Sequence, residues 1–177
     1  MNKLLILLSF FVFSSVFSQT NWMTMEEAMN AQKTQPKKIL IDFYADWCGP
    51  CKIMEKKTYN HPEISKSIND NYYAVKFNAE NSETISIFGR TFSNPDFVSG
   101  KKKNAMHEFT KYMNVNAVPA IVFLDLNNQP ITMLQGALTA KELEPYLTLL
   151  SQEEYKLIDT KEKWEIYQKK YRSKIKN

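Results

Sequence analysis

The chain contains 177 residues, of which 44% are hydrophobic and 24% are charged, and its formal net charge is +4. This hydrophobic fraction and balanced charge exclude a disordered tail, and the length corresponds to one domain with a sizeable core. Two cysteines are too few for a disulfide-dense scaffold or for a four-thiolate zinc site. The two cysteines are therefore available for chemistry.

Residues 1–18 have the three-part pattern of a secretory signal peptide. Lys3 precedes the apolar run 4–13, and Val16 and Ser18 occupy the positions that a signal peptidase reads before Gln19. An uncleaved membrane anchor is the alternative, but a membrane span needs about 20 apolar residues and this stretch becomes polar too early. We therefore expect cleavage between Ser18 and Gln19, and a periplasmic or secreted protein in a compartment where disulfides persist.

Charge says little about partners. Residues 161–177 hold seven Lys or Arg and two Glu, whereas residues 19–160 hold fifteen Lys or Arg and seventeen Asp or Glu. A basic tail on a nearly neutral body is not typical of nucleic-acid-binding proteins, so no nucleic-acid partner is expected.

Helices and strands alternate in the first half of the mature chain. A capping box of Thr24 and Glu27 predicts a helix over residues 25–33, and an apolar, β-branched run predicts a buried strand over residues 38–44. The pattern predicts four further elements: a helix from the cysteine motif to about residue 57, a helix from residue 61 to about 69 capped by Asn60, a strand over 72–78 and a helix over 82–88.

The second half begins with residues 89–104, which carry Gly, Ser, Asn and Pro and are expected to form a surface insertion. The elements predicted next are a helix over 105–113, a strand over 120–124, its hairpin partner over 131–135, and a helix that Thr139 and Glu142 cap and Pro145 bends. Residues 151–177 form a basic helical extension whose apolar stripe is expected to dock on the protein's own domain. This order predicts an α/β fold with a central mixed sheet flanked by helices.

The candidate chemistry lies at Cys48 and Cys51, which follow a predicted strand and begin a helix. Backbone N–H groups and the helix dipole stabilise a thiolate there, so Cys48 is expected to be an exposed nucleophile with a lowered pKa. Cys51 lies one turn further on the same face, where it can attack a mixed disulfide and release the substrate. A bridge over so short a loop stabilises a fold little, which favours redox chemistry over a structural disulfide.

A family resemblance rests on residues 41–52, which read Ile-Asp-Phe-Tyr-Ala-Asp-Trp-Cys-Gly-Pro-Cys-Lys. This segment resembles the active-site signature of the thioredoxins, and the similarity covers residues 39–150. It implies a thioredoxin-like domain over residues 19–150, with the insertion before a cis-proline. Residues 55–64 resemble secreted domains related to the C-terminal domain of the DsbD reductases.

The resemblance assigns roles to individual residues. Asp42 matches a buried acid that takes the proton of the second cysteine, and Lys76 matches its lysine neighbour. The residues that match the substrate groove are Trp47, Gly49, Pro50, Val118, Pro119 and Gly136, with a cis bond before Pro119. From the residues alone, Asp42 could be a solvated strand-end acid, Lys76 an exposed strand residue, Pro119 a trans proline and Gly136 a helix-entry turn.

The expected function is a thiol–disulfide oxidoreductase that reduces protein disulfides outside the cytoplasm through Cys48 and Cys51. Its expected partners are disulfide-bearing proteins and a membrane-embedded thiol donor; the protein is expected to be a monomer without metal or organic cofactor. His61 and His107 lack paired ligand spacing, and are expected to be a helix-start and an exposed helical histidine. The alternatives are a disulfide oxidase or isomerase, and a non-catalytic binding module.

Overall fold

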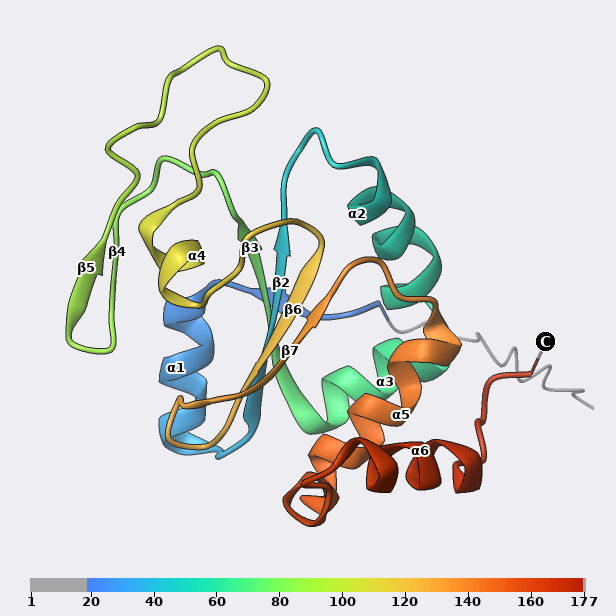
Figure 1. Ribbon diagram of the computed structural model, residues 1–177. Coiled ribbons are helices and arrows are strands. Elements are labelled where there is room, and N and C mark those ends of the chain that lie inside the picture. The colour runs from blue at the N-terminus through green and yellow to red at the C-terminus, as the bar shows by residue number, and fades with distance from the viewer. Residues whose placement is uncertain (1–18, 177) are drawn as a thin grey trace, which may run out of the picture.

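The computed structural model of the protein describes residues 19–176 (Figure 1). Its main sheet has five strands in the spatial order β1 (Trp22–Met23), β3 (Tyr72–Asn78), β2 (Lys38–Tyr44), β6 (Ala120–Leu124) and β7 (Pro130–Gln135). The predicted signal peptide lies outside the described residues. Within the described part, no helix is both long and apolar enough to cross a membrane.

The sheet is mixed. β1 and β2 both run parallel to β3, whereas β6 is antiparallel to β2 and β7 is antiparallel to β6. Phe43 near the end of β2 pairs with Phe77 of β3 and with Ala120 at the start of β6. The loops after β2 and β3 and the loop before β6 therefore meet at one end of the sheet.

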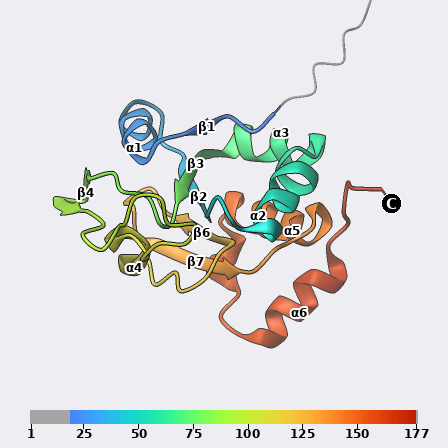
Figure 2. The same ribbon diagram turned by 90° about the horizontal axis from the view of Figure 1, so that it is seen from above.

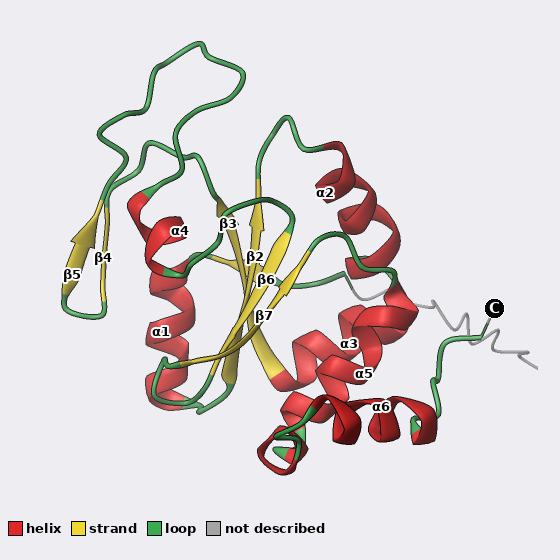
Figure 3. Cartoon of the chain, in the orientation of Figure 1, coloured by secondary structure: helices red, strands yellow, loops and turns green. Residues whose placement is uncertain are grey.

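Helices cover both faces of the sheet (Figures 2 and 3). One face carries α1 (Met25–Thr34) and α4 (Glu108–Tyr112), and the other carries α2 (Gly49–Met54), its π-helical continuation η1 (Glu55–Tyr59), α3 (Pro62–Asn71) and α5 (Ala140–Ser151). Side chains of β2 alternate between the two cores: Ile41 and Phe43 join the first, and Leu40 joins the second. The same alternation directs Asp42 toward the face of α2 and α3.

The helix starts follow the capping patterns with one exception. The boxes of Thr24 with Glu27 and of Thr139 with Glu142 are both formed. The cap of α3 is His61 instead of Asn60, because its imidazole accepts the Glu63 amide while Pro62 begins the helix.

The helix predicted over residues 82–88 is wrong. The chain there forms β4 (Ile85–Ile87), which pairs with β5 (Arg90–Phe92) in a separate hairpin. Phe88 and Gly89 join the two strands with φ values of 54° and 69°, as a two-residue hairpin turn with positive φ requires. The hairpin precedes and overlaps the predicted surface insertion over residues 89–104, and it forms a two-stranded sheet separate from the main one.

The prediction that His107 is exposed is also wrong. His107 is fully buried, caps α4 through the Phe109 amide, and hydrogen bonds over 2.8 Å with the Glu83 carbonyl. The helix predicted over 105–113 therefore starts later, at Glu108. His107 is its N-cap residue, and the His107 side chain also links α4 to the loop before β4.

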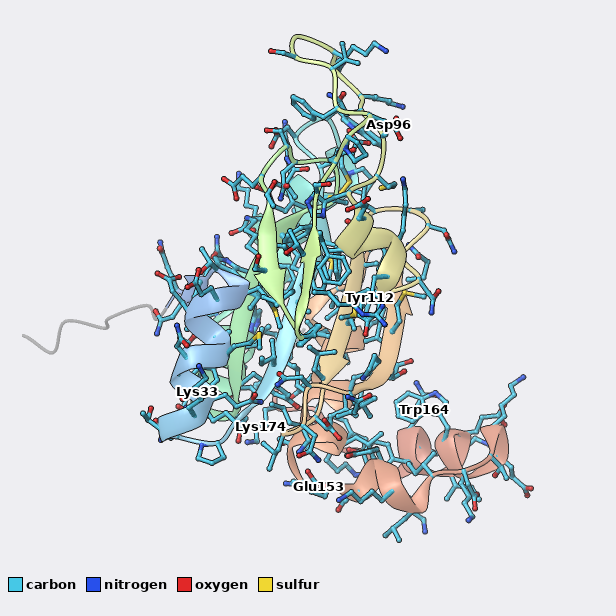
Figure 4. All side chains as sticks on the ribbon, turned by 90° about the vertical axis from the view of Figure 1, so that its left-hand side faces the viewer. Lys33, Asp96, Tyr112, Glu153, Trp164 and Lys174 are labelled. Atoms are coloured by element: carbon cyan, nitrogen blue, oxygen red, sulfur yellow. A yellow bond between two sulfur atoms is a disulfide. The ribbon has the colours of Figure 1, made fainter. Side chains whose placement is uncertain are left out.

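The C-terminal extension packs against α5. It contains η2 (Glu154–Leu157) and α6 (Lys161–Lys170), which carries Trp164 (labelled in Figure 4). The ring centroid of Trp164 lies 4.6 Å from that of Tyr146 in α5. Beyond α6, the Lys174 amide donates to the buried Glu144 carboxylate over 2.8 Å. The extension is therefore held on the helical layer, away from the end of the sheet where the cysteine loop lies (Figure 1).

Candidate active site

The two cysteines form a disulfide at the start of α2. Cys48 is the N-cap residue, its Cα lies 5.3 Å from that of Cys51, and its Sγ accepts the Cys51 amide over 3.2 Å. Pro50 occupies the first turn of the helix, where its missing N–H removes no intrahelical hydrogen bond. The Cys48 sulfur is thus placed where unpaired backbone N–H groups stabilise a thiolate once the bond is reduced.

The expectation that Cys48 is exposed is wrong for this disulfide form. Cys48 is 1% exposed and Cys51 is 7% exposed, because Trp47 and Val118 pack against them. The exposed residues of the motif are Gly49 and Pro50. A reacting thiol must therefore approach Cys48 between the flanking side chains.

Asp42 is 3% exposed and is not a solvated strand-end acid. Burial raises its pKa to about 7, and a hydrogen bond of 2.9 Å from the Tyr59 hydroxyl opposes that rise because it favours the carboxylate. Burial also raises the pKa of Tyr59 well above its usual range, so the hydroxyl remains a donor. A carboxyl group with such a pKa exchanges its proton near neutral pH, as a general acid or base must.

Lys76 lies beside Asp42 in the register of β3 with β2. It forms an ion pair with Glu55, and its ammonium lies 5.1 Å from the Tyr44 ring centroid. The positive charge of Lys76 lowers the pKa of Asp42, whereas the negative charge of Glu55 raises it. Lys76 is therefore half-buried in a charged network.

A hollow of about 260 Å³ connects these groups. Its lining residues are Asp42, Tyr44, Ala45, Asp46, Cys51, Lys52, Glu55 and Lys76. Charged side chains reach into the hollow from both sides, and it is large enough to hold water molecules. It offers a route for a proton between Cys51, Asp42 and the solvent.

The loop before β6 borders the disulfide on another side. The Val118–Pro119 peptide bond is cis, and Val118 packs against the disulfide cluster. The Pro119 carbonyl accepts the Gly136 amide over 2.9 Å. Gly136 has a φ of 95°, a conformation that glycine adopts without steric penalty, and it follows directly after β7.

Trp47 is tied to the insertion through Glu80. One carboxylate oxygen of Glu80 accepts the Trp47 indole N–H over 3.0 Å and the Asn104 amide over 2.8 Å. The ammonium of Lys103 lies 4.1 Å from the Trp47 ring centroid, within the range of a cation–π contact. The insertion therefore reaches the side chain that precedes Cys48.

Sequence reasoning missed the parts that Tyr59, Glu55 and Glu80 take in this site. Tyr59 reaches Asp42 from the π-helical turn. A π-helical turn changes the spacing of side chains around the helix, so the regular α-helical periodicity of the sequence does not place Tyr59 on the face toward Asp42. Glu80 follows β3 and meets its partners only through the tertiary fold. Glu55 alone had a detectable signal, because it lies four residues after Cys51 and so shares its helix face.

A dithiol–disulfide pair beside a buried carboxyl group defines a thiol–disulfide oxidoreductase site. In agreement, a family model described as a thioredoxin-like domain matches residues 25–151. The chain belongs to this thioredoxin-like family, which confirms the predicted resemblance and the thioredoxin fold. Within residues 19–176, no cluster of three or more His, Cys, Asp or Glu side chains is arranged to hold a metal ion.

Individual relatives support the same assignment. Thioredoxin-T of Drosophila melanogaster is 37% identical over 75 residues, which cover 42% of this chain and 46% of that protein. The thiol:disulfide interchange protein DsbD of Haemophilus ducreyi is 27% identical over 133 residues, which cover 74% of this chain and 19% of that protein. The match thus spans less than half of either relative. The solution structure of a thioredoxin from Thermus thermophilus superposes with a TM-score of 0.55 at 16% identity, covering 75% of this chain and 87% of that one.

Proposed function

We propose that this oxidoreductase reduces disulfide bonds of other proteins outside the cytoplasm. The observation that carries the proposal is the Cys48–Cys51 disulfide at a helix start, close in the fold to a carboxyl group whose pKa is about 7. A pair of this kind can cycle between dithiol and disulfide, and Asp42 can exchange a proton during the cycle.

In the proposed reaction, the Cys48 thiolate attacks one sulfur of the substrate disulfide. A mixed disulfide forms, and the other substrate sulfur leaves as a thiolate that takes a proton from water. Cys51 then passes its proton to Asp42, and its thiolate attacks the Cys48 sulfur. The internal disulfide forms, the second substrate thiolate leaves, and two electrons have passed from the protein to the substrate.

The groove for the substrate is proposed to lie between Trp47 and the cis-proline loop. An extended substrate segment can pair with the Val118 backbone, as a strand adds to a sheet edge. The other residues proposed to border the groove are Gly49, Pro50, Pro119 and Gly136.

Direction and location rest on the sequence. Gly49-Pro50 resembles the dipeptide of reducing thioredoxins, and residues 1–18 have the pattern of a signal peptide. A reductase outside the cytoplasm must be reduced again, so we propose a membrane-embedded thiol donor as its partner. The protein is proposed to act as a monomer.

The test is a measurement of the Cys48–Cys51 reduction potential in graded thiol–disulfide buffers, combined with a trapping variant. A strongly reducing potential supports the proposed direction, and a markedly oxidising one contradicts it in favour of an oxidase or isomerase. Cys51→Ala should accumulate mixed disulfides with substrates through Cys48, whereas the matched Cys48→Ala/Cys51→Ala variant should not. If the pair does not cycle and only non-covalent partners bind, the protein is a binding module.

A further inference from the structure

We infer that Lys101, Lys102 and Lys103, the lysine cluster of the insertion, form a docking surface for acidic residues close to the reacting cysteine of a substrate protein. This inference rests on the proposed function and adds a substrate class to it. Acidic substrate segments would be recognised by charge beside the disulfide, in addition to the backbone pairing at Val118.

The first observation is the position of the cluster. The insertion extends from the end of the sheet that carries the cysteine loop (Figure 1). Lys103 lies over the Trp47 ring, and Trp47 packs against the disulfide. A substrate chain whose sulfur bonds to Cys48 therefore passes within a few residues of the cluster, since an extended chain advances about 3.3 Å per residue.

The second observation is that the base of the insertion is fixed. Glu80 is 8% exposed and joins Trp47 to Asn104. At the other end of the loop, the buried Asn94 side chain donates to the carbonyls of Asn81 and Ala105 over 3.0 and 2.8 Å. The cluster is thus presented from a braced loop, which reduces the entropy lost when a partner binds.

The third observation is that the lysines of the cluster are exposed and form no ion pairs within residues 19–176. The insertion borders a hollow of about 240 Å³ that also contains Asp46, Glu80 and Glu83. Glu80 is buried and doubly hydrogen bonded, whereas Asp46 and Glu83 are exposed, and Asp46 accepts the Asn78 side-chain amide over 3.2 Å. The three exposed lysine ammoniums outnumber these two exposed carboxylates, so the net charge that meets an approaching substrate beside Trp47 is positive.

The experiment measures how fast the reduced full-length protein reduces three peptides, each with one cysteine in a mixed disulfide with 2-mercaptoethanol. The residues flanking the cysteine are Asp, Asn or Lys, and each rate is divided by that with dithiothreitol to cancel intrinsic reactivity. We expect the Asp peptide to exceed the Asn peptide by about three- to tenfold at low salt, and this ratio to fall toward one as salt screens the charges.

Substitutions of the three lysines test whether the lysine cluster causes the preference for the Asp peptide. K101Q/K102Q/K103Q should bring the Asp-to-Asn ratio close to one, and K101E/K102E/K103E should favour the Lys peptide. The matched control K33Q/K169Q/K170Q removes the same charge far from the disulfide and should keep the ratio; Figure 4 shows Lys33 at the opposite end of the molecule from Asp96 of the insertion. An equal loss in the control, or an unchanged ratio in the cluster variants, would overturn the inference.

A binding measurement separates this inference from the proposed function. Cys48→Ser/Cys51→Ser cannot exchange disulfides, and it should still bind the Asp peptide more tightly than the Asn peptide. If no peptide is reduced but this order of binding holds, the reductase proposal fails and the docking surface stands. If all peptides are reduced equally and bound equally, the docking surface fails and the reductase proposal stands.

Discussion

The Tyr59 hydroxyl donates a hydrogen bond of 2.9 Å to Oδ1 of Asp42, and both side chains are buried. The contact joins the π-helical turn after α2 to the strand that leads into the cysteine motif. It favours the carboxylate of Asp42, whereas burial favours the protonated acid. The pKa of Asp42 is thus a balance between two features of the fold, and Tyr59 is one that a single substitution removes.

Tyr59→Phe should raise the pKa of Asp42 by about one unit, because a hydrogen bond to a charged group contributes about 1.5–3 kcal/mol and part of that is recovered by other contacts. The carboxyl stretching band of the oxidised protein, followed by infrared spectroscopy from pH 4 to 9, measures this pKa directly. Tyr72→Phe is the matched control, since its buried hydroxyl donates to the Leu147 carbonyl instead. An equal shift in both variants, or none in Tyr59→Phe, would contradict the assignment.

Asp42→Asn should make the protein more stable at alkaline pH. The pKa of Asp42 is raised in the folded state, so the folded protein binds more protons than the unfolded chain between about pH 4 and 7. Stability from this group is therefore lost as pH rises through that window, by about 2–3 kcal/mol between pH 5 and 8. Urea unfolding of the oxidised protein at both pH values checks this: the difference should be smaller in Asp42→Asn than in the wild type by about that amount.

Lys76 and Glu55 should move the pKa of Asp42 in opposite directions. Lys76→Gln removes a positive charge that favours the carboxylate, so the pKa should rise. Glu55→Gln removes a negative charge and should lower it, while its amide oxygen can still accept the Trp22 indole N–H. Infrared titration of the two variants gives both signs in one experiment. Shifts of the same sign would mean that breaking the ion pair, and not the local charge, determines the result.

The sequence predicted four of the five strands of the main sheet, and most helix starts, because local signals and tertiary packing agree there; it missed the two-residue strand β1. Thr24 with Glu27 forms a local capping box, and the apolar, β-branched run of β2 has the length and composition of a strand buried on both faces. At residues 82–88 the local signals conflicted. Ile85 and Ile87 alternate with Ser86 as in a strand, but the turn at Phe88 and Gly89 depends on positive φ values that composition alone does not reveal.

The candidate site likewise contains residues that the local sequence indicates and contacts that only the tertiary fold creates. The cysteine pair and Asp42 belong to one contiguous motif, so the sequence could indicate them together. The contacts of Glu80 with Trp47 and Asn104 join residues that lie 33 and 24 positions apart, and the contact of His107 with Glu83 spans 24 positions. Such pairs form only when the tertiary fold brings these loops together, so no local sequence pattern predicts them.

Glu80→Ala should loosen the insertion and the active-site tryptophan together. The substitution leaves the Trp47 indole N–H and the Asn104 amide without their shared acceptor, and losing such buried contacts typically costs about 1–3 kcal/mol. Hydrogen exchange at the Asn104 amide should become faster, and limited proteolysis should cut residues 94–104 sooner than in the wild type. Glu83→Ala is the matched control, because this exposed glutamate lies on the same loop and uses only backbone atoms to contact His107 and Asn81. If both variants protect the Asn104 amide as well as the wild type does, the Glu80 carboxylate does not hold the insertion, and the braced presentation of Lys103 beside Trp47 loses its structural basis.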